Sequence, residues 1–350
     1  MTTMLRNILM AIAALVLVPV TGASYEAIAS ASAHRNHHAP GELIDVGGYR
    51  LHLNCTGEGA PTVILDAGLG GSNLDWALVQ PELSRTTRTC SYDRAGMGWS
   101  ERRQGPRSPE RIADELAVLL DRAYVDGPHI LVAHSLAGKN ARLFAMRNRE
   151  DVVGMVLIDA RHEYVDEHTS ASEQRSFLAA LHGQRFQYGA ARRLGIARLF
   201  GNHLAGAPSM TAQARVEMAL LGTEPEALVA TVQEGCERSA SDDLLRNAPS
   251  LGDLPLVAIA AGQNLPEPRW AEGQRRLAAL STSGRLVVAQ GSSHAVAWDD
   301  PELVIATVRE VITAARSRWE SEKFTRHAPV DASESGMHRK RDTGPRAFSD

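Results

Sequence analysis

Cysteine is scarce in this sequence: only Cys55, Cys90 and Cys236 occur in 350 residues. Three cysteines are too few for a disulfide framework, and their spacing matches no paired-cysteine metal motif. The sequence also lacks a large excess of either charge, because it contains 37 Lys and Arg and 41 Asp and Glu. Without a broad basic surface, a nucleic-acid partner is not expected. No internal repeat is present, and the 44% hydrophobic content allows one large domain or two small ones.

The N-terminus differs from the rest of the chain. Arg6 precedes an uninterrupted apolar run from Ile8 to Val18. The run is short for a membrane-spanning helix, which needs about 20 apolar residues, and it suits the apolar core of a secretory signal. Small residues at 29–34 offer cleavage sites but lie far beyond the run. We therefore expect residues 1–33 to be a signal peptide or an uncleaved membrane anchor, with a buried helix of the fold as the weaker alternative. The protein is then exported, either secreted or periplasmic, or anchored in the membrane.

The C-terminus becomes polar and highly charged. Residues 321–350 contain too few apolar side chains to offset the entropy of ordering, so we expect a disordered tail. Its "HRKRD" stretch could touch anionic lipid or nucleic acid, but a solvated tail is the commoner explanation.

Seven segments have the composition of β-strands, and most are apolar enough to be buried on both faces. They are residues 49–55, 61–68, 87–93, 129–134, 152–160, 254–262 and 284–291. Helical patterns alternate with them. Ser108 is a plausible N-cap before Pro109 in the helix expected at 108–123, and a helix at 301–319 closes the domain. This alternation predicts an α/β fold with a mainly parallel sheet and helices on both faces.

One interval interrupts the alternation. Residues 163–250 contain short amphipathic helical patterns and no convincing strand. We expect a helical cap here, inserted between the strands at 152–160 and 254–262, with the core formed by 43–162 and 251–318. A cap at the end of the sheet would shape a pocket and exclude water, whereas the alternative is a helical decoration far from any site.

Ser135 lies where the strand "HILVA" turns into a helical pattern. A nucleophile on such a turn needs small residues two positions before and after it, because the serine backbone is strained. Here these are Ala133 and Ala137, followed by Gly138. The usual pattern has glycine at both positions. The strand before Ser135 and the helix after it favour a nucleophile over an ordinary small residue.

A serine hydroxyl becomes a good nucleophile only when a base takes its proton. His294 follows the last predicted strand and precedes the closing helix, which is where the base should come in chain order. The reaction also needs two donors for the developing oxyanion. We expect the backbone N–H groups of Leu136, which follows the nucleophile, and of Leu69, in the glycine-rich loop after "TVILD".

Five segments occur in the order seen in the α/β-hydrolase superfamily. They are "DAGLGGSNLDW", "CSYDRAGMGWS", "ILVAHSLAG", "VLIDA" and "GSSHAVAWDDPELV". Over residues 43–316 the chain resembles the capped serine hydrolases of the esterase and proline-iminopeptidase type. It departs from many members in having Ala67-Gly68 where they carry His-Gly. Dehalogenases and epoxide hydrolases of this fold use Asp where Ser135 stands, so these relatives are disfavoured. The "SYDRAGMGWS" segment is expected to be a structural turn, with no catalytic role for Asp93 or Arg94.

The resemblance implies that a carboxylate orients His294, and two residues are candidates for this role. Many relatives place it after the strand corresponding to 254–262, where only Glu267 is available here. Some lipases of the fold draw it from the preceding strand, which ends at Asp159. We favour Asp159 and keep Glu267 as the alternative.

The resemblance implies a serine hydrolase that cleaves a carboxylic ester or related acyl bond of a small molecule through an acyl-enzyme intermediate. An aminopeptidase of the proline-iminopeptidase type and a non-catalytic binding protein are the alternatives. No metal or organic cofactor is implied. The N-terminal segment is the part of the chain through which membrane association is expected. The family's sheet order also makes the strands of Cys55 and Cys90 antiparallel neighbours, so a disulfide between them is one option that export would permit.

Overall fold

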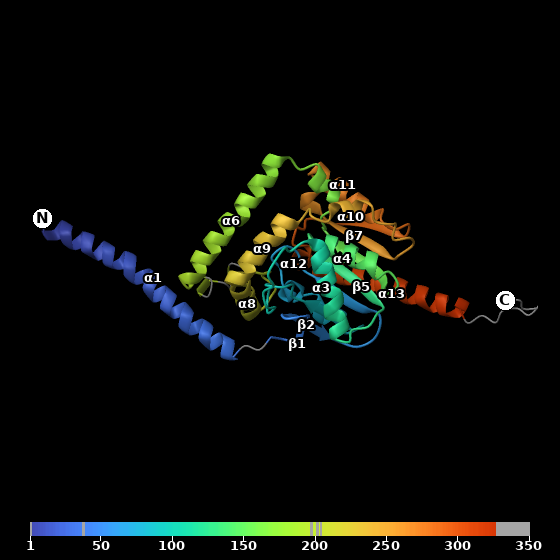
Figure 1. Cartoon of the computed structure of the whole chain (residues 1–350), viewed down its shortest axis with the longest axis horizontal. Helices are drawn as coiled ribbons and strands as arrows, with labels where there is room; N and C mark the ends of the chain where they lie inside the picture. Colours follow the sequence, from blue (N-terminus) through green and yellow to red (C-terminus); the bar gives the residue numbers. More distant parts are fainter. Residues whose placement is uncertain (1, 37–38, 197–198, 201–202, 204, 327–350) are drawn as a thin grey trace, which may run out of the picture.

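The computed structural model describes residues 2–36, 39–196, 199–200, 203 and 205–326. Its centre is one eight-stranded sheet with the strand order β1-β2-β4-β3-β5-β6-β7-β8 (Figure 1). Strand β2, the second from one edge, runs antiparallel to both of its neighbours, β1 and β4, and all other neighbouring pairs are parallel. The strands are β1 (Glu42–Asp45), β2 (Arg50–Thr56), β3 (Thr62–Asp66), β4 (Thr89–Tyr92), β5 (His129–His134), β6 (Val152–Ile158), β7 (Leu256–Ala261) and β8 (Gly284–Ala289).

Helices cover both faces of the sheet and form two apolar cores. On one face, α3 (Pro109–Arg122), α4 (Ala137–Arg147) and α11 (Pro268–Ala278) pack Leu116, Phe144 and Leu277 against the strands. On the other face, η1 (Asn73–Trp76), α2 (Gln80–Leu83), α12 (Val296–Asp299) and α13 (Pro301–Arg326) contribute side chains such as Trp76 and Val308. The strands between these layers are buried on both sides, which explains their continuous apolar runs.

The predicted α/β architecture is confirmed, and all seven predicted strands are present. The eighth, β1, escaped prediction because it is four residues long and mostly exposed, so it carries no apolar run. The helix start at α3 is also as predicted: the Ser108 side chain accepts a hydrogen bond from the amide of Arg111, and Pro109 begins the helix.

Every element of the described residues between β6 and β7 is helical, in the interval where the sequence predicts a cap. The cap helices are α5 (Glu163–Glu167), α6 (Ala171–Arg193), α8 (Ala212–Gly222), α9 (Pro225–Glu237) and α10 (Asp242–Arg246). Helix α6 lies on α9, where a Cβ added at Gly235 would be 2.3 Å from Leu181. A glycine at this position therefore lets the two helices approach closely.

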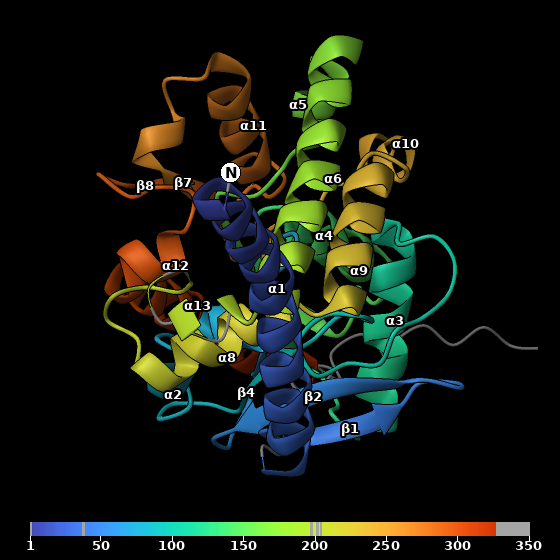
Figure 2. The same ribbon diagram turned by 90° about the vertical axis from the view of Figure 1, so that its left-hand side faces the viewer.

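The N-terminal segment forms one helix, α1 (Thr2–Asn36), which lies outside the sheet, passes the end of α6 and extends beyond the cap toward the N-terminus (Figures 1 and 2). Its residues Gly22 and Tyr25 touch Leu194 and Gly195, just beyond the end of α6. Among the described residues, no helix has both the length and the apolar composition needed to cross a membrane. At the other end, α13 continues to Arg326, so the helix extends into the start of the segment predicted as a tail; residues 327–350 lie outside the described residues.

Cys55 and Cys90 form a disulfide. They face each other directly in the antiparallel pair of β2 and β4, the arrangement that the family resemblance implied. The bridge ties the antiparallel edge of the sheet to its parallel centre.

Replacing both bridged cysteines by serine should lower the free energy of unfolding by about 2–4 kcal/mol, because the bridge restricts the unfolded chain. Urea denaturation followed by circular dichroism measures this. Cys236→Ser, at an exposed free cysteine, is the control and should change stability by less than about 0.5 kcal/mol. A double variant as stable as the wild type would contradict the expectation.

Candidate active site

Ser135 occupies a strained turn between β5 and α4. Its φ of 56° lies in the left-handed region that side chains other than glycine rarely adopt. The backbone is held there on both sides: the Ser135 amide donates to the carbonyl of Ile158 at 3.0 Å, and its carbonyl accepts from the amide of Arg161 at 2.9 Å. A Cβ added at Gly138 would be 2.6 Å from that of Ala160, so the helix start tolerates no side chain there.

A continuous hydrogen-bonded chain runs from Ser135 to a buried carboxylate. The His294 Nε2 atom is 2.8 Å from Ser135 Oγ, and its Nδ1 is 2.6 Å from Asp159 Oδ2. A carboxylate at Nδ1 favours the tautomer with its proton on that nitrogen. Nε2 is then free to accept the serine proton. His294 lies in the loop between β8 and α12, and the three side chains come from three parts of the sequence.

Asp159 is fully buried and accepts three further hydrogen bonds. The donors are Asn264 Nδ2 at 2.6 Å, Trp270 Nε1 at 2.8 Å and the amide of Ala261 at 3.0 Å. Burial raises the pKa of Asp159, but hydrogen bonds from His294, Trp270 and Ala261 outweigh it and leave the pKa below its ordinary value. The carboxylate therefore stays ionised and fixed in orientation.

Glu267, the alternative acid, is engaged elsewhere. It caps the N-terminus of α11, where its side chain accepts from the amide of Trp270 at 2.5 Å and pairs with Arg269 at 2.8 Å. The structure thus brings Asp159, and not Glu267, to His294.

The loop after β3 lies directly against Ser135. A Cβ added at Gly68 would be 3.1 Å from the Ser135 Cβ and 2.8 Å from the ring of His134. In the described part of the chain, the amides of Leu69 and Leu136 donate to no protein acceptor. Two backbone N–H groups, that of Leu136 in the turn and that of Leu69 in the facing loop, are therefore available to an oxyanion. Because Gly68 has no side chain, the loop can lie close to Ser135.

Arg94 fixes the loop after β3 through hydrogen bonds to its carbonyl groups. The sequence did not predict this structural role. The Arg94 guanidinium is buried and donates to the carbonyls of Ala67 at 2.6 Å and Gly68 at 2.7 Å. It also pairs with Asp66 at 2.8 Å and with Glu234, on cap helix α9, at 2.9 Å. Arg94 therefore connects the end of β3, the loop and the cap.

His134 is a second residue that the sequence analysis missed. Its Nε2 donates to the backbone carbonyl of His294 at 2.8 Å, with the two rings 4.7 Å apart. Burial, with the nearby His294, lowers the pKa of His134 to about 4, so it is neutral at physiological pH. Its position next to Ser135 in the sequence was the available signal. No sequence signal pointed to Asn264 or Trp270, because neither residue lies in a motif.

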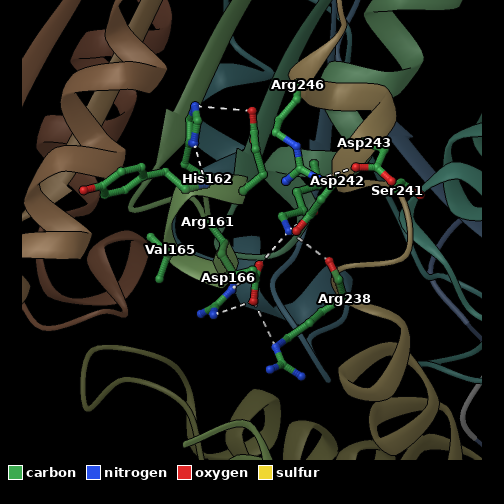
Figure 3. A network of polar contacts seen from close by, with 12 residues as sticks. Arg161, His162, Val165, Asp166, Arg238, Ser241, Asp242, Asp243 and Arg246 are labelled. Atoms are coloured by element: carbon green, nitrogen blue, oxygen red, sulfur yellow. Dashed lines mark hydrogen bonds and ion pairs between the residues drawn. The ribbon is translucent and has the colours of Figure 1, made fainter. Parts of the chain in front are cut away.

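A second buried polar network fixes the cap to the helix that follows Ser135 (Figure 3). Lys139 on α4 is fully buried and donates to Asp166 at 2.7 Å and also to Asp242. Asp166 further accepts from Arg161 at 2.8 Å and from Arg238 at 3.2 Å, and Figure 3 shows both guanidinium groups converging on it. The network joins α4 to α5, the end of α9 and α10.

His162 borders this network and titrates abnormally. It caps α5 by accepting from the amide of Tyr164 at 3.0 Å. Burial, together with the positive charge of Arg142, lowers the pKa of His162 to about 4. The unfolded chain binds a proton near pH 6.5, whereas the folded protein does so only near pH 4. His162 therefore reduces stability progressively as the pH falls from about 6.5 to 4.

His162→Gln should make stability less dependent on pH. The wild-type loss of unfolding free energy between pH 7 and 5 should shrink by roughly 2 kcal/mol in the variant, because glutamine binds no proton. Urea denaturation at the two pH values measures this, and His182→Gln, on the exposed side of α6, is the matched control. An unchanged pH dependence in His162→Gln would refute the assignment.

Comparison with known proteins bears on the fold and the family. A family model described as "Alpha/beta hydrolase family" matches residues 63–307, more than half of the chain. An AB hydrolase superfamily protein of Gibberella zeae is 27% identical over 73% of this chain and 87% of its own length. An uncharacterised protein of Schizosaccharomyces pombe is 29% identical over 78% of this chain, which spans only 56% of that protein.

Solved structures show the same fold at low sequence identity. A thermophilic esterase from Thermogutta terrifontis aligns with a TM-score of 0.59 and 22% identity, over 78% of this chain and 97% of its own. An enol-lactonase from Burkholderia xenovorans aligns with a TM-score of 0.55 and 19% identity, over 78% and 100%.

Proposed function

The chain belongs to the alpha/beta hydrolase family, and from this premise we propose that it is a serine hydrolase that cleaves a carboxylic ester or related acyl bond through an acyl-enzyme intermediate. The observation that carries the proposal is the hydrogen-bonded chain from Ser135 through His294 to Asp159, with separations of 2.8 and 2.6 Å. Within this family it supports acyl transfer to a serine.

In the proposed reaction, Ser135 Oγ attacks the substrate carbonyl while His294 Nε2 takes the hydroxyl proton. The oxyanion of the tetrahedral intermediate accepts hydrogen bonds from the amides of Leu69 and Leu136. Collapse of the intermediate breaks the acyl bond, and His294 returns the proton to the leaving group. Water, deprotonated by His294, then attacks the acyl-enzyme and releases the acid. Asp159 stays ionised throughout and stabilises the imidazolium.

The cap favours an uncharged acyl group over one that carries an ammonium. An aminopeptidase would need an acidic cap group to bind the ammonium. The buried cap carboxylates Glu234, Asp166 and Asp242 are instead each already paired with a buried cation, either Arg94 or Lys139. The complete set of nucleophile, base and acid also argues against a non-catalytic binding protein. We therefore propose a small, uncharged and partly hydrophobic acyl substrate.

We further propose that the protein is exported, with residues 1–33 as a signal peptide or membrane anchor. Arg6 followed by an apolar run supports this proposal. The Cys55–Cys90 disulfide supports it independently, because such bridges persist in oxidising compartments.

Ser135→Ala and His294→Gln should abolish hydrolysis of short acyl esters, because they remove the nucleophile and the base. Asp159→Asn should lower kcat by up to about four orders of magnitude, since an amide favours the wrong imidazole tautomer. Kinetics with p-nitrophenyl acyl esters and labelling of Ser135 by a fluorophosphonate probe measure these effects.

Glu267→Gln is the matched control for the acid, and it should retain near wild-type turnover once circular dichroism has shown that it folds. An active Asp159→Asn beside an inactive Glu267→Gln would reverse the assignment of the acid. Folded wild type that neither reacts with the probe nor hydrolyses acyl esters would refute the proposed function.

The export proposal predicts where the full-length chain accumulates. Expressed in a bacterium with its N-terminus intact, it should fractionate with the membrane or beyond it, because secretion machinery recognises a basic residue before an apolar run. Immunoblotting of cytosol, membrane and periplasm measures this, and a chain lacking residues 1–33 is the control. Full-length protein in the soluble cytosol would contradict export.

A further inference from the structure

One part of the cap is basic and contains no carboxylate. Between Glu173 and Glu217 the sequence has no Asp or Glu, although acids slightly outnumber bases in the whole chain. The same stretch contains six arginines: Arg175, Arg185, Arg192, Arg193, Arg198 and Arg215. It spans most of α6, the connection to α8 and the start of α8. Arg192 is buried and pairs with Glu224, but the other arginines leave this stretch basic in an otherwise balanced sequence.

Helix α6 presents an aromatic ring between two arginines on its outer face. Leu181 is buried against α9 and marks the inner face. Phe186 lies about 140° around the helix from it and is 78% exposed. Arg175 and Arg193 lie within about 20° of Phe186 on the helical wheel, and both are exposed. Neither has an ion-pair partner in the described part of the chain.

The apolar surface continues beyond α6. Four further side chains there are exposed by 37–58%: Leu194, Ile196, Leu199 and Phe200. They lie next to α1, whose Tyr25 touches Gly195. Helix α1 comes close to the cap only near the end of α6, and its N-terminal half projects away from the cap (Figure 1), with exposed apolar residues that include Leu5, Leu9 and Leu17. Large apolar side chains and guanidinium groups thus lie together on the outer face of α6 and on the residues that follow it.

We propose that this cap surface, the outer face of α6 with residues 194–196, 199 and 200, docks onto an anionic lipid membrane. Aromatic and aliphatic side chains among arginines are the composition that suits the boundary between headgroups and acyl chains. The arginines are attracted to anionic headgroups, and no carboxylate in the stretch opposes that attraction. A second copy of the chain is a poorer occupant, because pairing this surface with itself would bring arginines together.

Co-sedimentation of the full chain with vesicles tests the proposal. Binding to phosphatidylcholine vesicles containing about one-third phosphatidylserine should be at least tenfold tighter than to pure phosphatidylcholine, and should weaken as salt is raised. Arg175→Gln/Arg193→Gln should lose about fivefold in affinity per arginine on the anionic vesicles only. Phe186→Ser/Phe200→Ser should bind both vesicle types more weakly.

The matched control is Arg111→Gln/Tyr124→Ser, which removes an exposed arginine and an 85% exposed aromatic residue from the core and should bind as the wild type does. Cap variants that bind like the wild type would overturn the proposal, because α1 alone would then carry any membrane binding. Equal affinity for neutral and anionic vesicles would also overturn it. So would a lipid-free dimer, seen by analytical ultracentrifugation, that the cap variants abolish.

Discussion

The buried guanidinium of Arg94 is the interaction on which the active-site loop and the cap jointly depend. It donates hydrogen bonds to the carbonyls of Ala67 and Gly68 and forms ion pairs with Asp66 and Glu234. One side chain therefore connects the sheet, the loop and α9. A buried ion pair adds little net stability over an apolar replacement, but breaking one side of it costs about 3–5 kcal/mol. The cap is therefore held in place by the same group that positions the loop beside Ser135.

The geometry at Ser135 depends on a second constraint, the crowding of the turn. The left-handed φ of Ser135 persists because hydrogen bonds to Ile158 and Arg161 hold both of its peptide groups, and because Gly138 leaves room for Ala160. Asp159 itself has a positive φ of 38° and follows β6 directly. Two neighbouring parallel strands thus end in strained residues, and this aims the serine and the carboxylate at one histidine.

The sequence was informative wherever an interaction has a local pattern. Alternating apolar runs and amphipathic segments predicted the sheet and its two helical layers, and small residues around Ser135 marked the turn. The short, exposed β1 carried no such pattern. The contact of Arg94 with Glu234 joins residues 140 positions apart, and that of Lys139 with Asp242 joins residues 103 apart. Nothing near these residues in the sequence specifies their partners, so the buried networks could be found only in the folded chain.

The inner and outer sides of the cap differ in how their charged groups are paired. On its inner side, buried carboxylates of α5, α9 and α10 are each paired with Arg94 or Lys139 of the core. On its outer side, the arginines of α6 outnumber the acids, and Phe186 and Phe200 remain in water. An exposed surface that is both basic and apolar lowers the solubility of the protein unless a partner covers it. Because the inner networks hold the cap against the core, contact at the outer surface would orient the whole molecule, including the site at Ser135, relative to whatever it meets.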